Sequence, residues 1–179
     1  NVFTEPCAPE GRIEGDTIED CWAISLLPFY DAGSTCGFAD DYDETCPYGG
    51  YPAPDVVYAY TPPHDMCVSI SLCSSYYDTK LYVYEGGWTP GMPVACNDDN
   101  FDCVDPPVPY TSWIEDVLFA AGETYYVVVD GYWSDCGEYL LEVCEVECID
   151  CDIVCQGVPE GEPTCYDDYV DMYNGGCST

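Results

Sequence analysis

The chain is a succession of short β-type segments separated by turns, and this pattern limits the fold more than any other feature. In residues 78–85, Leu81 and Val83 alternate with Tyr82 and Tyr84. An alternating run of β-branched and aromatic residues favours a strand that is covered on both faces. We therefore expect residues 78–85 to form a central strand of a sandwich.

Further segments carry the same kind of signal, with Gly and Pro turns between them and no helical period. The strongest is residues 124–132, which run from Thr124 through three consecutive valines to Tyr132. The others are residues 21–30, 55–60, 67–73, 94–96, 113–119 and 138–146. About eight short strands at this spacing predict an all-β fold, an antiparallel jelly-roll-like β-sandwich.

The polar ends of the chain suggest three regions. Residues 21–146 hold the predicted sandwich, residues 1–20 form an N-terminal arm, and residues 147–179 form a disulfide-rich C-terminal tail or linker. Neither end has enough apolar residues for a core of its own, so disulfides or a neighbouring molecule would have to order them.

Charge is the second constraint on this chain. Thirty-five acidic residues face only Arg12 and Lys80, which gives a net charge of −33. Such a surface repels nucleic acid and anionic membranes. A fold with this charge needs cross-links or bound cations, and Ca²⁺ suits many oxygen ligands from flexible loops better than Mg²⁺ does. Adaptation to acid or high salt is the alternative explanation.

Fifteen cysteines indicate a disulfide-rich protein from an oxidising compartment, outside the cell. We expect local bonds from Cys36 to Cys46 and from Cys96 to Cys103, and disulfides at Cys165 and Cys177 of the tail. Because the total is odd, one thiol is free, joins another chain, or pairs beyond the ends of this sequence.

Two cysteine patterns need separate treatment. If Val68, Ile70 and Leu72 face the core, then Cys67 and Cys73 lie about 20 Å apart along one strand and cannot pair with each other. The second pattern comprises Cys144, Cys148, Cys151 and Cys155. This spacing resembles that of zinc and iron–sulfur ligands, although disulfides are the better interpretation in a secreted chain.

The chain begins without a Met and contains neither a signal-type apolar region nor an apolar run of about 18 residues. We therefore expect a mature secreted segment that does not insert into a membrane.

Two acidic loops are candidate calcium sites, and a solvated turn is the alternative for each. The candidate ligands are Asp40, Asp41 and Asp43 in the first loop, and Asp98, Asp99 and Asp102 in the second. Trp88, Trp113 and Trp133 are candidates for stacking on sugar rings, although tryptophans in turns also cover the core.

Catalysis is not expected from this sequence. Its one histidine, His64, precedes Asp65 in an extended loop, where that carboxylate would point away from the imidazole. The nucleophile elbow, P-loop and dinucleotide-binding motifs are absent. We expect no cofactor other than Ca²⁺.

Several of these segments, in this order and spacing, resemble the bacterial pre-peptidase C-terminal domain over roughly residues 15–146. They are residues 55–62, 69–72, 78–86, 96–100, 121–132 and 137–143. The resemblance implies a small secreted β-sandwich, often calcium-binding, that is attached to hydrolases or repeated in surface proteins. Residues 159–177 are similar to a linking motif of multidomain secreted bacterial proteins.

Two functions fit this reading of the sequence. The first is a non-catalytic structural subunit of an extracellular filament, in which copies of the chain join through their arms by strand addition or disulfides. The second is an accessory module of a secreted hydrolase or adhesin that binds polysaccharide or a fibrous protein.

Overall fold

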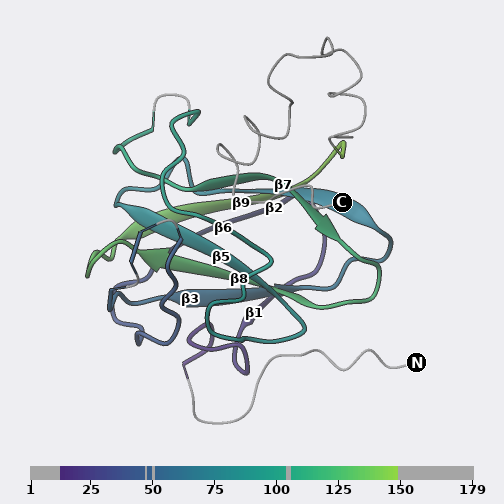
Figure 1. Ribbon diagram of the computed structural model, residues 1–179, viewed down its shortest axis with the longest axis horizontal. Coiled ribbons are helices and arrows are strands. Elements are labelled where there is room, and N and C mark those ends of the chain that lie inside the picture. Colours follow the sequence, from purple (N-terminus) through teal and green to yellow (C-terminus); the bar gives the residue numbers. More distant parts are fainter. Residues whose placement is uncertain (1–12, 47, 50, 104–105, 149–179) are drawn as a thin grey trace, which may run out of the picture.

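Nine strands form two stacked sheets in the computed structural model, which describes residues 13–46, 48–49, 51–103 and 106–148 (Figure 1). The five-stranded sheet has the order β1-β3-β8-β5-β6, and the four-stranded sheet has the order β2-β9-β4-β7. The strands are β1 (Trp22–Ile24), β2 (Phe29–Ser34), β3 (Val56–Tyr60), β4 (Met66–Ser71), β5 (Thr79–Glu85), β6 (Ala95–Asn97), β7 (Trp113–Phe119), β8 (Tyr125–Gly131) and β9 (Glu138–Val146). The predicted all-β sandwich is confirmed.

All neighbouring strands run antiparallel except β1 and β3, which are parallel. No helix within the described residues is long and apolar enough to cross a membrane. The tail beyond Cys148 lies outside the described residues.

Strand β5 is buried on both faces, as its alternating sequence predicts. Leu81 and Val83 face the core between the two sheets. Tyr82 and Tyr84 point to the opposite side and belong to a second apolar cluster, which lies outside the five-stranded sheet. The loops before β1 and after β2 cover this outer face. The sandwich therefore has a third, irregular layer that the strand pattern alone does not predict.

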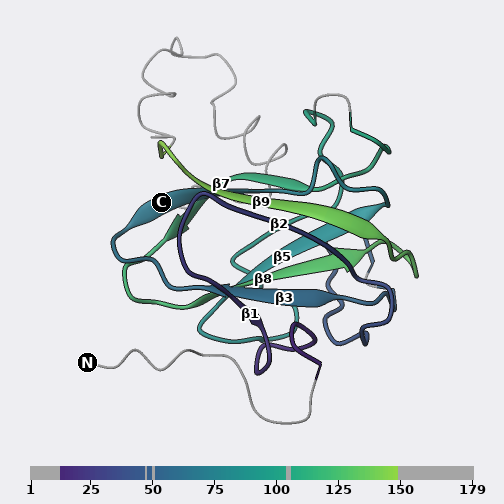
Figure 2. The same ribbon diagram turned by 180° about the vertical axis from the view of Figure 1, so that it is seen from behind.

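Residues 21–30 form two strands, although the sequence suggested one. Strand β1 pairs with β3 in one sheet, and β2 pairs with β9 in the other. Pro28 lies between them and has no backbone N–H to donate to a ladder, so pairing is interrupted there. Figure 2 shows the chain crossing from β1 to β2, and hence from one sheet to the other.

Part of the predicted N-terminal arm packs on its own sandwich. The backbone N–H of Val57 donates to the carbonyl of Gly15 at 2.8 Å. The N–H of Ile18 donates to the hydroxyl of Tyr42 at 2.8 Å, and the Ile18 side chain lies against the outer apolar cluster. Residues 13–20 therefore extend the irregular layer that covers β5. Residues 1–12 lie outside the described part of the chain.

Among the described cysteines, four disulfides join segments that are distant in the sequence. They are Cys36–Cys136, Cys46–Cys96, Cys67–Cys148 and Cys73–Cys103. The predicted local bonds Cys36–Cys46 and Cys96–Cys103 are therefore wrong. The cause is the sheet topology. In the β2–β9 pair, Ser34 lies opposite Glu138. This pairing brings Cys36, which follows β2, close to Cys136, which precedes β9.

Two other cysteine predictions can be compared with the structure. Cys67 and Cys73 do not pair with each other, as expected. Cys21 is also disulfide-bonded, whereas Cys144 is the one free thiol among the described cysteines. Cys151, Cys155, Cys165 and Cys177 lie outside the described residues.

Candidate functional site

Three loop segments meet at one end of the five-stranded sheet. Strand β5 is antiparallel to both of its neighbours, so its beginning lies beside the ends of β6 and β8. Asp78 precedes β5, Asp98 and Asp99 follow β6, and Tyr132 follows β8. The N–H of Tyr132 donates to the carbonyl of Asp78 at 3.0 Å, which ties two of these segments together.

The first feature of this end is an acidic cluster, defined as Asp78, Asp98 and Asp99. One carboxylate oxygen from each lies within 4.8 Å of the others. Asp98 is 1% exposed, and the other two are half-buried. Oδ2 of Asp98 and Oδ1 of Asp78 are buried and have no hydrogen-bond partner. The cluster thus holds oxygen atoms that are shielded from water and unsatisfied by protein donors.

Burial dominates the electrostatics of the cluster. It raises the pKa of Asp98 to about 7 and that of Asp78 to about 6, and the neighbouring carboxylates raise both further. Burial also raises the pKa of Asp99. The charge of Lys80 lowers the pKa of Asp98 and Asp78, but by less than burial raises them. The cluster is therefore a place where a positive ligand would relieve an unfavourable charge.

Lys80 itself is buried and holds a neighbouring loop. Its Nζ donates to the carbonyl of Glu44 at 2.8 Å, to that of Tyr48 at 3.3 Å and to that of Gly49 at 3.5 Å. The single lysine of the chain thus fixes the loop that carries Tyr48 against the start of β5.

The second feature is an aromatic patch, defined as Tyr48, Tyr51, Tyr132 and Trp133. The rings of Tyr51 and Trp133 are stacked, with 4.6 Å between their centroids and 14° between their planes. Tyr132 meets Tyr48 and Tyr51 edge-on at 6.4 and 6.0 Å. Trp133 is 56% exposed, Tyr48 53% and Tyr51 38%, so much of the patch is open to solvent.

The backbone at Trp133 is unusual. Its φ of 58° lies in the left-handed region, which residues other than Gly, Asn and Asp rarely adopt. The adjoining turn is closed by the N–H of Asp135, which donates to the carbonyl of Tyr132 at 3.0 Å. The fold thus holds Trp133 outward at some conformational cost.

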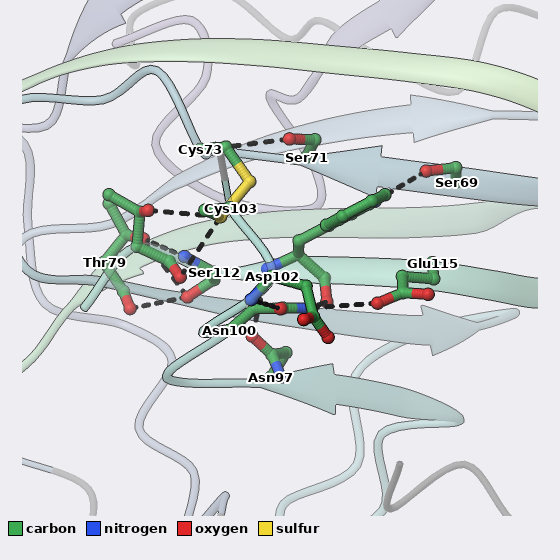
Figure 3. The surroundings of a disulfide bond; sticks show 12 residues. Ser69, Ser71, Cys73, Thr79, Asn97, Asn100, Asp102, Cys103, Ser112 and Glu115 are labelled. Carbon is green, nitrogen blue, oxygen red and sulfur yellow. Dashed lines mark hydrogen bonds between the residues drawn. A yellow bond between two sulfur atoms is a disulfide. The ribbon is translucent and has the colours of Figure 1, made fainter. Parts of the chain in front are cut away.

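The acidic loop after β6 is fixed by neighbours from other elements (Figure 3). Its end is bonded to the segment after β4 through Cys73–Cys103. Ser112 Oγ lies 2.6 Å from the carbonyl oxygens of both Asp98 and Thr79, so its single O–H can donate to either one. Asn100 Nδ2 donates to the carbonyl of Trp113 at 3.0 Å. These contacts hold the backbone of Asp98 and Asp99 in place without any ligand.

The structure separates the calcium ligands suggested by the sequence. Asp98 and Asp99 lie in the acidic cluster, whereas Asp102 is exposed and its N–H donates to Asn100 Oδ1 at 2.8 Å. Asp40, Asp41 and Asp43 are exposed, and within the described residues they are not part of a group of three ligands. Asp78 was not among the predicted ligands, because it comes from the other side of a hairpin.

The three tryptophans lie at three different places. Trp133 belongs to the aromatic patch. Trp88 follows the opposite end of β5, where it meets Tyr42 edge-on at 5.5 Å and is 40% exposed. Trp113 is half-buried on β7 in the other sheet, and its Nε1 donates to Ser69 Oγ at 2.8 Å. They cannot act as one sugar platform.

His64 is exposed, and its Nε2 lies 3.3 Å from Oε1 of Glu145. Asp65 points elsewhere, as expected, because its Oδ1 accepts the N–H of Ala121 at 2.8 Å. An open hollow on the other sheet, between Tyr76 and the start of β9, carries a single carboxylate, that of Glu138. Neither place combines a nucleophile with an oriented base.

The fold and the site define a compact β-sandwich module, cross-linked by disulfides of the kind that extracellular proteins use. No protein-family model and no curated protein matches the chain. Among solved structures, the chain is similar to the pre-peptidase C-terminal domain of collagenase from Bacillus anthracis, at 17% identity and a TM-score of 0.49, over 75% of this chain and 99% of that one. This domain is the one that the sequence signatures resemble.

Proposed function

We propose that the chain is a non-catalytic extracellular module that binds polysaccharide through the aromatic patch. The observation that carries the proposal is the exposed stacked pair of Tyr51 and Trp133. Large aromatic faces left in water forgo the free energy of burial, so a group of them on a surface marks an interaction site. The apolar C–H faces of pyranose rings are suited to such ring faces, while the tyrosine hydroxyls can bond sugar hydroxyls.

The conformation of Trp133 supports this use of the patch. A non-glycine residue at a φ of 58° costs about 1–2 kcal/mol relative to an ordinary turn. Such strain persists where the surrounding structure enforces it, and it is concentrated at ligand-binding positions. Here the enforced conformation turns the indole outward against Tyr51 instead of into the core.

The charge of the chain narrows the polysaccharide class. A net charge of −33 repels uronate- or sulfate-bearing polymers at low salt. The polymers best suited to the patch are therefore neutral ones, such as cellulose and chitin. Retention of the protein on these polymers should depend little on ionic strength, because ring stacking carries the contact.

The test is retention on insoluble polymers. Wild-type protein is expected to sediment with cellulose or chitin. Trp133→Ala and Tyr51→Ala should each weaken binding by about fivefold or more, since one stacked ring contributes about 1–3 kcal/mol in nucleic-acid complexes. Trp88→Ala is the matched control, because Trp88 is similarly exposed but lies at the other end of β5.

Equal losses for Trp88→Ala and Trp133→Ala would refute the patch as the binding surface, provided that all variants keep the wild-type melting temperature. Retention on collagen fibres but on no polysaccharide would reassign the module to a fibrous protein. Absence of retention on any polymer would overturn the proposal.

The assembly of copies into a filament has less support. The idea rests on terminal arms that need a neighbour to lie on, yet residues 13–20 pack on their own sandwich through Gly15 and Ile18. Filament formation stays a prediction. Analytical ultracentrifugation of the full chain would support it if the sedimentation coefficient rose with concentration, and monomers throughout would remove it.

A further inference from the structure

We propose that Asp78, Asp98 and Asp99 bind one calcium ion at the end of the five-stranded sheet where the start of β5 meets Tyr132. The site is inferred from the geometry of the carboxylates and stands whether or not the patch binds polysaccharide. It differs from both loops that the sequence suggests, because it joins Asp78 to two members of one loop and leaves Asp102 out.

The spacing of the oxygens fits a shared ion. Calcium–oxygen distances are about 2.3–2.6 Å, so two oxygens bound to one ion lie no more than about 5 Å apart. One oxygen from each of the three carboxylates lies within 4.8 Å of the others. A single ion can therefore contact all three with little movement of the side chains.

The burial of the oxygens points to a ligand rather than to a solvated turn. Asp98 is 1% exposed, and its Oδ2 has no hydrogen-bond partner, as is also true of Oδ1 of Asp78. A buried carboxylate oxygen without a donor costs free energy unless a cation or a proton compensates it. Lys80 is close by, but its ammonium donates to the carbonyls of the loop at Tyr48.

The backbone that carries the ligands is already fixed. Ser112 Oγ holds the carbonyl of Asp98 at 2.6 Å, and Cys73–Cys103 anchors the end of the loop (Figure 3). The N–H of Tyr132 holds the carbonyl of Asp78 at 3.0 Å. An ion entering this cluster would order few additional groups, which favours binding.

The ligand chemistry selects calcium among common divalent ions. All three ligands are carboxylates, whereas zinc and copper prefer nitrogen and sulfur. Magnesium demands near-ideal octahedral geometry and gives up its waters reluctantly. Calcium accepts an irregular set of oxygens and completes its coordination with water.

The experiment is a calorimetric titration of the full chain with CaCl₂, after treatment with chelator, in buffer at pH 8 with about 150 mM NaCl to screen weak surface binding. One ion should bind per chain, with a dissociation constant of about 1 mM or lower. Asp98→Asn should weaken this binding by at least about tenfold. Asp102→Asn, the matched control in the same loop, should change it less than about twofold, because Asp102 lies outside the acidic cluster.

Melting temperatures separate loss of the site from loss of the fold. In chelator, Asp98→Asn should melt at or above the temperature of the wild type, because the variant removes an uncompensated buried charge. Calcium should raise the melting temperature of the wild type and leave that of the variant unchanged. If Asp98→Asn does not fold, Asp99→Asn replaces it, since Asp99 is only half-buried and also supplies a ligand.

Two results would overturn the proposal. One is the absence of a saturable site, with only weak uptake of many ions. The other is an equal loss of affinity in Asp102→Asn and Asp98→Asn. Trp133→Ala should bind calcium with wild-type affinity, so a failure of the polysaccharide proposal would leave this one intact.

Discussion

Replacement of Asp55 by Asn should change how the stability of this protein depends on pH. Asp55 is fully buried directly before β3, and its Oδ2 accepts the N–H groups of Asp41 at 2.8 Å and Tyr42 at 3.0 Å. Burial raises the pKa of Asp55 to about 8, because it outweighs the two backbone hydrogen bonds, which lower that pKa. Its folded pKa is thus far above the value of about 3.9 for an unfolded chain.

The sign and size of the effect follow from proton linkage. Below pH of about 4, both states hold the proton and Asp55 causes no loss of stability. Between about 4 and about 8, only the unfolded state releases it, so the free energy of unfolding falls by about 1.4 kcal/mol per pH unit. The full loss by pH 8 is on the order of 5 kcal/mol.

Asparagine keeps the acceptor oxygen for the two N–H groups and removes the titration. Asp55→Asn should match the wild type within about 1 kcal/mol at pH 4 and exceed it by several kcal/mol at pH 8. The assay is guanidinium unfolding at pH 4, 6 and 8 with chelator present and disulfides intact. Asp65→Asn is the control, because Asp65 is exposed and likewise accepts a backbone N–H. A difference between Asp55→Asn and wild type that stays flat from pH 4 to 8, or that favours the wild type at high pH, would refute the reasoning.

Two further predictions test the long-range contacts. Replacing Cys36 and Cys136 together by Ser opens a loop of 100 residues and should lower the free energy of unfolding by about 4–5 kcal/mol, measured by guanidinium unfolding at pH 5. Non-reducing peptide mapping should join Cys36 to Cys136, and a peptide joining Cys36 to Cys46 would contradict the structure. Lys80→Met should cost about 1–3 kcal/mol, because three carbonyls lose their donor, and it should weaken polysaccharide binding by releasing the loop of Tyr48. Unchanged binding and stability in Lys80→Met would show that the lysine does not hold this loop.

The sequence predicts the strands well because their signal is local. Residues 124–132 and 138–146 carry alternating or continuous apolar side chains, and they form β8 and β9 almost to the residue. The split of residues 21–30 is less apparent, since both halves look like strand and only Pro28 marks the boundary. The cysteine pairing is not local at all. It depends on which strands become neighbours, and loop length favours short-range bonds that this topology does not form.

The candidate site lies between these two cases. Asp98 and Asp99 are visible as part of an acidic loop, but Asp78 joins them only because β5 and β6 pair with Leu81 opposite Asn97. Counting back from that hairpin register would have placed Asp78 beside the loop after β6, so a signal was present in the sequence. Tyr51 offers no such signal, because it lies in a proline-containing loop and reaches Trp133 only through the folded chain.

The buried carboxyl groups of this fold are compensated in different ways. Five carboxylates are buried in the described residues, those of Asp20, Glu44, Asp55, Asp98 and Asp130, against the single buried cation of Lys80. Burial holds the pKa of Asp130 well above its usual value, as it does that of Asp55, so burial favours the protonated form of both carboxyl groups. Glu44 accepts the hydroxyl of Tyr84 and the N–H of Gly91, both at 2.8 Å, and its carbonyl accepts from Lys80.

Asp98 alone among these five carboxylates lies in a group of metal-ligand spacing, so a cation is its natural partner. The charges that shift the pKa of Asp55 include Asp41 and Asp40, whereas those acting on Asp98 are Lys80, Asp99 and Asp78. Because none of these named charges acts on both carboxyl groups, we expect the two effects to be independent and additive. Asp55→Asn should flatten the pH dependence of the free energy of unfolding and leave the calcium-induced rise in melting temperature intact. Asp98→Asn should abolish that rise, but the steep loss of stability with rising pH that Asp55 causes should remain. A double variant that departed from this additivity would show that the two groups share one electrostatic environment.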